Sequence, residues 1–156
     1  MNNQYDVYSP PKETSTVIQH VYSPIQAAMG CFLGGPLASI VLIRHNFKVL
    51  GNIDAEKKTT FYGAIIFLLF LLVVALLPEK FSNIVIPLIT MFATGYFINK
   101  NQFTKQAIEE SPLLTFQSNW RVFWIGVVCF VLTIVAFVVL VVIFGSLGIN
   151  LLPNQQ

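Results

Sequence analysis

The feature that most limits how this chain can fold is a set of four long runs without charged residues. The first lies within residues 22–51, where no residue from Ile25 to Ile43 is charged. This run is close to the roughly 20 residues that an α-helix needs to cross the hydrocarbon core of a bilayer. Only 10% of all residues are charged, against about 25% in soluble domains. The chain is therefore predicted to be an all-α, polytopic membrane protein.

The uncharged runs and the polar segments between them predict the spans. We expect four transmembrane helices, over about residues 24–43, 61–77, 83–98 and 121–147. They form one membrane domain, residues 22–152, between a polar N-terminal tail (1–21) that is typical of disorder and a short C-terminal tail (153–156). Four crossings place both termini on the same side of the membrane.

The first run carries small residues along one helical face. Gly30, Gly34 and Ala38 recur every four residues, and small residues at this spacing let a second helix approach closely. Gly35 and Pro36 interrupt the middle of the run and predict a kink, because proline removes a backbone donor and clashes with the preceding turn. These five residues are predicted to form a helix-packing surface and a groove for a partner.

Residues at the ends of the runs predict where helices start and where the headgroup layers lie. Ser23 is a suitable N-cap and Pro24 suits the first helical position. Near residue 105 a short amphipathic turn is expected to lie on the membrane, with Phe103, Ala107 and Ile108 on one side. Polar and aromatic side chains suited to membrane interfaces are expected to anchor the spans: Arg44, His45, Asn46, Trp120, Arg121 and Trp124.

The distribution of Lys and Arg predicts the orientation. Two of these residues, Lys12 and Lys80, fall on the side of the termini. Seven fall on the other side: Arg44, Lys48, Lys57, Lys58, Lys100, Lys105 and Arg121. The positive-inside rule therefore places the two longer connections in the cytoplasm and both termini in the periplasm.

The predicted spans hold no ionisable side chain apart from two thiols, which argues against proton-coupled pumping and voltage sensing. Polar contacts inside the membrane are expected from Gln26, Thr90 and Thr94. The chain lacks an arrangement of residues typical of catalysis, and His45 has no companion at metal-ligand spacing. We therefore predict no catalytic residues, no metal, no cofactor and no enzymatic activity.

Part of the first third of the chain resembles a pattern in small, uncharacterised bacterial membrane proteins. The residues that carry the resemblance are Tyr22-Ser23-Pro24-x-Gln26, then Phe32-Leu33-Gly34-Gly35-Pro36-Leu37-Ala38, then Asn46-Phe47 and Leu50-Gly51. The resemblance implies a bacterial inner-membrane location and no assigned activity.

Two kinds of function fit the sequence. The first is interaction through helix–helix contacts in the bilayer, as an accessory subunit or as an immunity protein against a membrane-inserting toxin. The second is a small oligomeric channel or carrier for a neutral or lipidic solute, with Gln26, Thr90, Thr94 and Asn99 along its path. The expected partners are the lipid bilayer and another membrane protein or a toxin, with a homo-oligomer as a further option, and nucleic acid is not expected.

Overall fold

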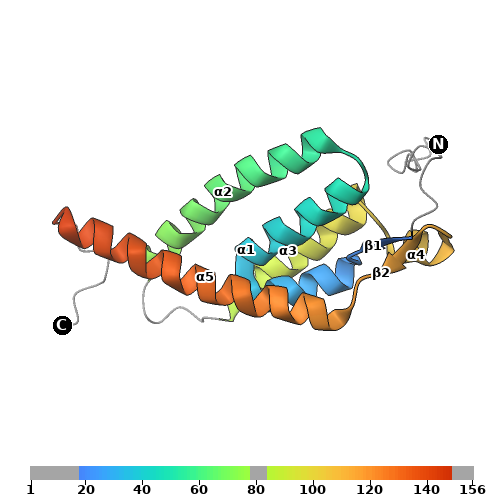
Figure 1. The fold of residues 1–156 in the computed structure, drawn as a ribbon. Helices are drawn as coiled ribbons and strands as arrows, with labels where there is room; N and C mark the ends of the chain where they lie inside the picture. Colours follow the sequence, from blue (N-terminus) through green and yellow to red (C-terminus); the bar gives the residue numbers. More distant parts are fainter. Residues whose placement is uncertain (1–17, 78–83, 149–156) are drawn as a thin grey trace, which may run out of the picture.

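A computed structural model describes residues 18–77 and 84–148 (Figure 1). The described elements are β1 (Gln19–Val21), α1 (Pro24–Val49), α2 (Ile53–Leu76), α3 (Val85–Asn101), α4 (Lys105–Glu110), β2 (Leu114–Phe116) and α5 (Asn119–Ser146). The turn at 78–83, the C-terminal tail and most of the expected N-terminal tail lie outside the described residues. Three helices, α1, α2 and α5, are long and apolar enough to cross a membrane by length and composition.

Helix α1 is folded back on itself at Gly35. This glycine has φ 64° and ψ −158°, a backbone region that essentially only glycine adopts, and the following Pro36 disfavours a helical residue before it. The Tyr22 N–H donates to Asn46 Oδ1 at 2.9 Å, whereas an unbroken helix would separate these residues by about 36 Å. The two arms, residues 24–34 and 36–49, therefore form an antiparallel hairpin (Figure 1).

The hairpin corrects the prediction that residues 24–43 form a single, kinked helix that crosses the membrane. At 1.5 Å per residue, its arms are about 16 and 21 Å long, and each is too short to span the ~30 Å hydrocarbon core of a bilayer. The expected kink at Gly35 is thus a reversal of the chain. Four transmembrane helices are not confirmed, because α1 enters and leaves at the same end of the molecule.

Helices α2 and α5 extend beyond the tip of the α1 hairpin, whereas α3 lies alongside the hairpin (Figure 1). Helix α2 begins at Ile53, before the predicted start at residue 61, so Lys57 and Lys58 belong to the helix. Helix α3 has 17 residues and is about 26 Å long. Helix α5, with 28 residues, extends about 42 Å.

A small cap covers the end of the molecule at which α1 begins and ends. Strands β1 and β2 pair in parallel, with Gln19 opposite Leu114. Val21, Phe103, Ile108 and Leu114 form a buried apolar cluster beneath them. The expected short amphipathic turn lies at the helix α4. Phe103 and Ile108, which were expected to face the membrane, are instead buried in this cap.

The pairing of β1 with β2 in the cap fixes the position at which the described chain begins. Because β1 is hydrogen-bonded to β2, the residues before α1 share one end of the molecule with the connection between α3 and α5. Helix α5 starts at this end and carries the chain to the opposite end. This arrangement contradicts the prediction that both chain ends lie together, opposite the Lys- and Arg-rich connections.

Helix α1 lies at the centre of the helical packing, in contact with α2, α3 and α5. The core between these elements contains Tyr22, Ala27, Leu42, Ile98 and Val122. By contrast, α2 packs mainly on α1 and leaves most of its apolar surface exposed. Because α2 packs on α1 but not on α3, a groove remains between these three helices.

Candidate functional site: an apolar groove between α1, α2 and α3

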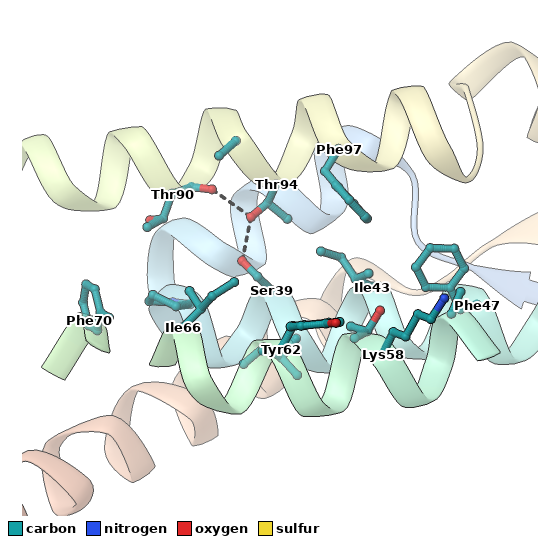
Figure 2. A pocket seen from close by; sticks show the side chains of 16 residues that line it. Ser39, Ile43, Phe47, Lys58, Tyr62, Ile66, Phe70, Thr90, Thr94 and Phe97 are labelled. Carbon is teal, nitrogen blue, oxygen red and sulfur yellow. Dashed lines mark hydrogen bonds between the residues drawn. The ribbon is translucent and has the colours of Figure 1, made fainter. Parts of the chain in front are cut away.

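A groove of about 600 Å³ lies between the second arm of α1, helix α2 and helix α3 (Figure 2). This volume is in the range typical of small-molecule sites. The lining is almost entirely apolar, and it consists of Pro36, Ser39, Ile40, Ile43, Phe47, Ala55, Lys58, Thr59, Tyr62, Gly63, Ile66, Phe70, Thr90, Ala93, Thr94 and Phe97. The groove is neither closed off nor a flat surface, and it is partly open to the outside of the molecule.

Local packing explains why the groove forms. Gly63 allows α2 to approach α1 closely, since a Cβ atom at Gly63 would lie 2.6 Å from Ile40 Cγ1. On the opposite wall, the rings of Phe47 and Phe97 meet edge to face with centroids 6.3 Å apart and join α1 to α3. Helix α2 has no comparable contact with α3, so the space between them stays open.

Hydroxyl groups line the middle of the groove near the tip of the hairpin (Figure 2). Ser39 Oγ and Thr94 Oγ1 lie 2.6 Å apart, and the Ser39 hydroxyl also lies 2.8 Å from Cys31 Sγ. Thr94 Oγ1 is 2.7 Å from the carbonyl oxygen of Thr90, and Thr90 bonds back to its own helix. These three hydroxyls are therefore bonded within the protein, which favours an apolar occupant in this part of the groove.

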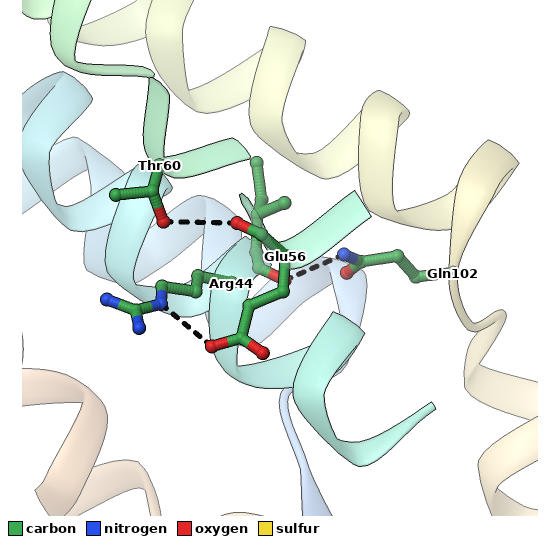
Figure 3. A network of polar contacts seen from close by, with 5 residues as sticks. Arg44, Glu56, Thr60 and Gln102 are labelled. Atoms are coloured by element: carbon green, nitrogen blue, oxygen red, sulfur yellow. Dashed lines mark hydrogen bonds and ion pairs between the residues drawn. The ribbon is translucent and has the colours of Figure 1, made fainter. Parts of the chain in front are cut away.

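One end of the groove carries charge. Lys58 lines the groove there (Figure 2) and forms neither an ion pair nor a hydrogen bond with any described residue. Nearby, Arg44 Nε donates to Glu56 Oε1 at 3.0 Å, so these two charges are paired (Figure 3). Gln102 Nε2 donates to the carbonyl oxygen of Ile43 at 2.8 Å and holds the end of α3 against α1.

The mouth of the α1 hairpin is closed by a buried amide. Asn46 is fully buried and pairs with the backbone of Tyr22 through both its oxygen, at 2.9 Å, and its nitrogen, at 2.8 Å. Its nitrogen also donates to Gln102 Oε1 at 3.1 Å. His45 Nε2 lies 2.9 Å from the carbonyl oxygen of His20. These contacts hold the second arm, and thus one wall of the groove, in place.

The start of α1 is tied to α5 by Gln26. Ser23 and Gln26 form the capping box that a serine N-cap followed by Pro24 makes possible. The Gln26 amide nitrogen then donates to the Gln117 carbonyl at 2.6 Å and to Asn119 Oδ1 at 2.8 Å. Gln26 therefore lies away from the groove.

Tyr22 sits beside this connection. Burial raises the pKa of its phenol above the ordinary value, and the charge of Arg121 and a hydrogen bond with Gln117 partly offset the rise.

The small residues of α1 pack within the chain. A Cβ atom at Gly30 would lie 2.9 Å from Leu42 Cδ1 and from Val122 Cγ1, and one at Gly34 would lie 2.7 Å from the Gly126 carbonyl oxygen. Ala38 is fully buried. The face predicted as a partner groove is thus covered by α5 and by the second arm of the hairpin.

The other predicted residues are spread over the molecule. Thr90 and Thr94 line the groove, whereas Asn99 lies beside Ile25 on another face. Trp120 and Trp124 are exposed at the start of α5, with ring centroids 5.9 Å apart, and Arg121 is exposed beside them. The residues expected to line one solute path therefore do not meet.

Several residues of the groove were not predicted from the sequence. Lys58, Tyr62 and Ile66 follow one another at helical spacing along one face of α2. After Tyr62 every residue of α2 is apolar, so the sequence does not show which face of this part of the helix lines a groove. Ser39 was not among the predicted polar contacts, because its partner Thr94 lies 55 positions away in the sequence.

Comparison with family models, with curated proteins and with solved structures finds no match for the chain. The resemblance to small bacterial membrane proteins therefore stays a prediction. In the described part of the chain, no three His, Cys, Asp or Glu side chains gather into a metal-binding group. The fold and the composition support a small multi-span membrane protein.

Proposed function

We propose that this protein is a small multi-span membrane protein that binds a lipid-like molecule in the groove between α1, α2 and α3. The observation that carries the proposal is an apolar, partly open cavity of about 600 Å³ between three helices. In a membrane, the molecules that reach such an opening are those dissolved in the bilayer. This function refines the carrier for a lipidic solute that the sequence allows.

The alternative, interaction with a partner helix or a toxin, relied on the small-residue face of α1. That face is occupied inside the chain, where Gly34 packs against the backbone of Gly126. An accessory or immunity role would need another surface. The groove therefore supports ligand binding better than it supports a partner-helix function.

The proposed topology follows from the hairpin and the basic residues. Arg44, Lys48, Lys57, Lys58, Lys100, Lys105 and Arg121 all belong to segments at the cap end of the molecule. By the positive-inside rule we place this end, together with β1, in the cytoplasm. Helices α2, α3 and α5 then cross the membrane, and α1 enters and returns as a re-entrant hairpin.

Filling the groove tests the function. Ala93 lines the groove from α3 and is exposed, so Ala93→Phe should occupy the space of the ligand. Ala64 is an exposed residue of α2 outside the groove, and Ala64→Phe is the matched control. Native mass spectrometry in a non-ionic detergent measures the lipid bound to each variant.

We expect the wild type and Ala64→Phe to retain a bound lipid, and Ala93→Phe to lose at least tenfold in occupancy. Equal retention by Ala93→Phe and Ala64→Phe, with both variants folded, would contradict the proposal.

A further inference from the structure

We infer that the ligand of the groove is an anionic phospholipid, with one acyl chain in the groove and its phosphate at Lys58. This inference rests on the proposed function and adds the chemical class of the ligand. Three features carry it: the depth of the groove, the nature of its walls and the charge at its mouth.

The depth of the groove matches one leaflet. Lys58 lies at one end of the lining and Phe70 at the other (Figure 2), and the helix rises about 18 Å over the twelve steps from Lys58 to Phe70. Half of the hydrocarbon core of a bilayer is about 15 Å. A chain that starts at the headgroup layer beside Lys58 would therefore end near Phe70, at the level of the hairpin tip.

The walls of the groove suit an acyl chain. Ile43, Ile66 and Phe70 present apolar surface along its length. The hydroxyls of Ser39 and Thr94 are bonded to each other at 2.6 Å and leave no donor that a polar solute would be needed to satisfy. A hydrocarbon chain has no hydrogen-bond donor or acceptor, so it can lie against these walls without leaving a polar group unpaired.

The mouth of the groove favours a negative headgroup. Lys58 is the charged residue among the lining residues of the described chain, it is exposed, and no described carboxylate pairs with it. Of the two acids in the first turn of α2, Glu56 is bound to Arg44, and Asp54, four positions before Lys58, forms no ion pair with it. A lysine ammonium at the headgroup layer, with its alkyl stem along apolar surface, attracts a lipid phosphate that carries a net negative charge.

The experiment compares two headgroups on the same acyl chains. Delipidated protein in non-ionic detergent receives equal amounts of phosphatidylglycerol and phosphatidylcholine, and native mass spectrometry gives the ratio of the two adducts. We expect the wild type to prefer phosphatidylglycerol roughly fivefold, which corresponds to the ~1 kcal/mol that one basic side chain contributes near an anionic surface. Lys58→Gln should bring the ratio close to one while lipid is still retained.

Two further variants make the outcome specific to the groove. Lys58→Arg keeps the charge and should keep the preference. Lys57→Gln removes the neighbouring exposed charge outside the groove lining and should leave the preference unchanged. The inference is overturned if Lys58→Gln keeps the wild-type ratio, or if Lys57→Gln lowers it equally. Equal binding of both lipids by the wild type refutes the headgroup assignment alone, whereas no binding of either lipid refutes the proposed function as well.

Discussion

Helices α1 and α2 have nearly the same length, 26 and 24 residues, and both are apolar enough to cross a membrane. Yet α1 folds into a hairpin packed on three sides, while α2 is a single rod that buries little of its surface: Gly63, Leu71 and Ala75. The difference lies in a few residues of α1. Gly35 permits the reversal, Gly34 permits close packing, and Asn46 closes the mouth of the hairpin.

The comparison shows that hydropathy and length alone do not distinguish a crossing helix from a re-entrant one. Both kinds of segment need apolar surface, because both are immersed in lipid or packed against other helices. What separates them is whether polar groups at the two ends of the segment can pair with each other. In α1 the Asn46 amide and the Tyr22 backbone do so.

Asn46→Ala should have the largest effect on this contrast. It leaves the Tyr22 backbone and Gln102 without their buried partner, and we expect a loss of about 3 kcal/mol in the free energy of unfolding, since an unsatisfied buried group costs about 1–3 kcal/mol. Unfolding by SDS in mixed micelles measures the change. Asn99→Ala, at an exposed position of α3, should leave the free energy of unfolding nearly unchanged. Equal losses of stability in both variants would contradict the role of Asn46 in closing the hairpin.

Gly34→Ala and Gly63→Ala compare tight glycines in the two helices. The Cβ atom at Gly34 would meet the Gly126 carbonyl oxygen at 2.7 Å, whereas the one at Gly63 would meet only the side chain of Ile40. Backbone cannot move aside as a side chain can, so Gly34→Ala should cost about 2 kcal/mol and Gly63→Ala less than half of that. The same SDS titration measures the free energy of unfolding of both variants. A larger loss of stability in Gly63→Ala than in Gly34→Ala would contradict the packing described for α1.

Gly35→Ala isolates backbone conformation from packing. A Cβ atom at Gly35 would meet nothing within 4 Å, and the same holds for Gly145 in α5. Only Gly35 of the pair has a positive φ, so Gly35→Ala should destabilise the fold by about 1.5 kcal/mol through backbone strain. Gly145→Ala, on the other hand, should not destabilise it. Thermal unfolding of the two variants in detergent makes the comparison, and indistinguishable midpoints would argue against the reversal at Gly35.

Thr94→Val should have the smallest effect. It removes the Ser39 contact between α1 and α3, and interhelical hydrogen bonds in membrane proteins contribute about 0.6 kcal/mol on average. Lipid occupancy by native mass spectrometry should stay at the wild-type level, since the hydroxyls bond to the protein. Thr133→Val, whose hydroxyl bonds only to its own helix, serves as the control. A Thr94→Val protein that lost its lipid would show that the hydroxyl contacts the ligand.

The sequence predicts the parts of this fold that depend on local chemistry. The capping by Ser23 and Pro24, the apolar helices and the short helix near Phe103 follow from residue types and their spacing. Gly35 and Pro36 also mark the correct place for a break.

The remaining features depend on contacts between distant residues. A glycine–proline pair indicates that a helix bends but not by how much, and the reversal needs Asn46 to meet Tyr22, 24 positions earlier. The strands have three residues each, too few for a periodic pattern. The groove arises because α2 packs on α1 and diverges from α3, and no local pattern in α2 reports this.

The reversal of α1 is the claim on which the groove and the proposed topology depend, and a distance across the hairpin tests it most directly. Spin labels at the exposed positions Ile18 and Lys48, with Cys31 and Cys129 replaced by alanine, report the separation of the two ends of α1 by pulsed electron paramagnetic resonance in bilayers. The hairpin predicts a distribution centred well below the roughly 36 Å that a continuous helix from Pro24 to Lys48 would span. A distribution centred at 36 Å or beyond would contradict the hairpin and, with it, the groove.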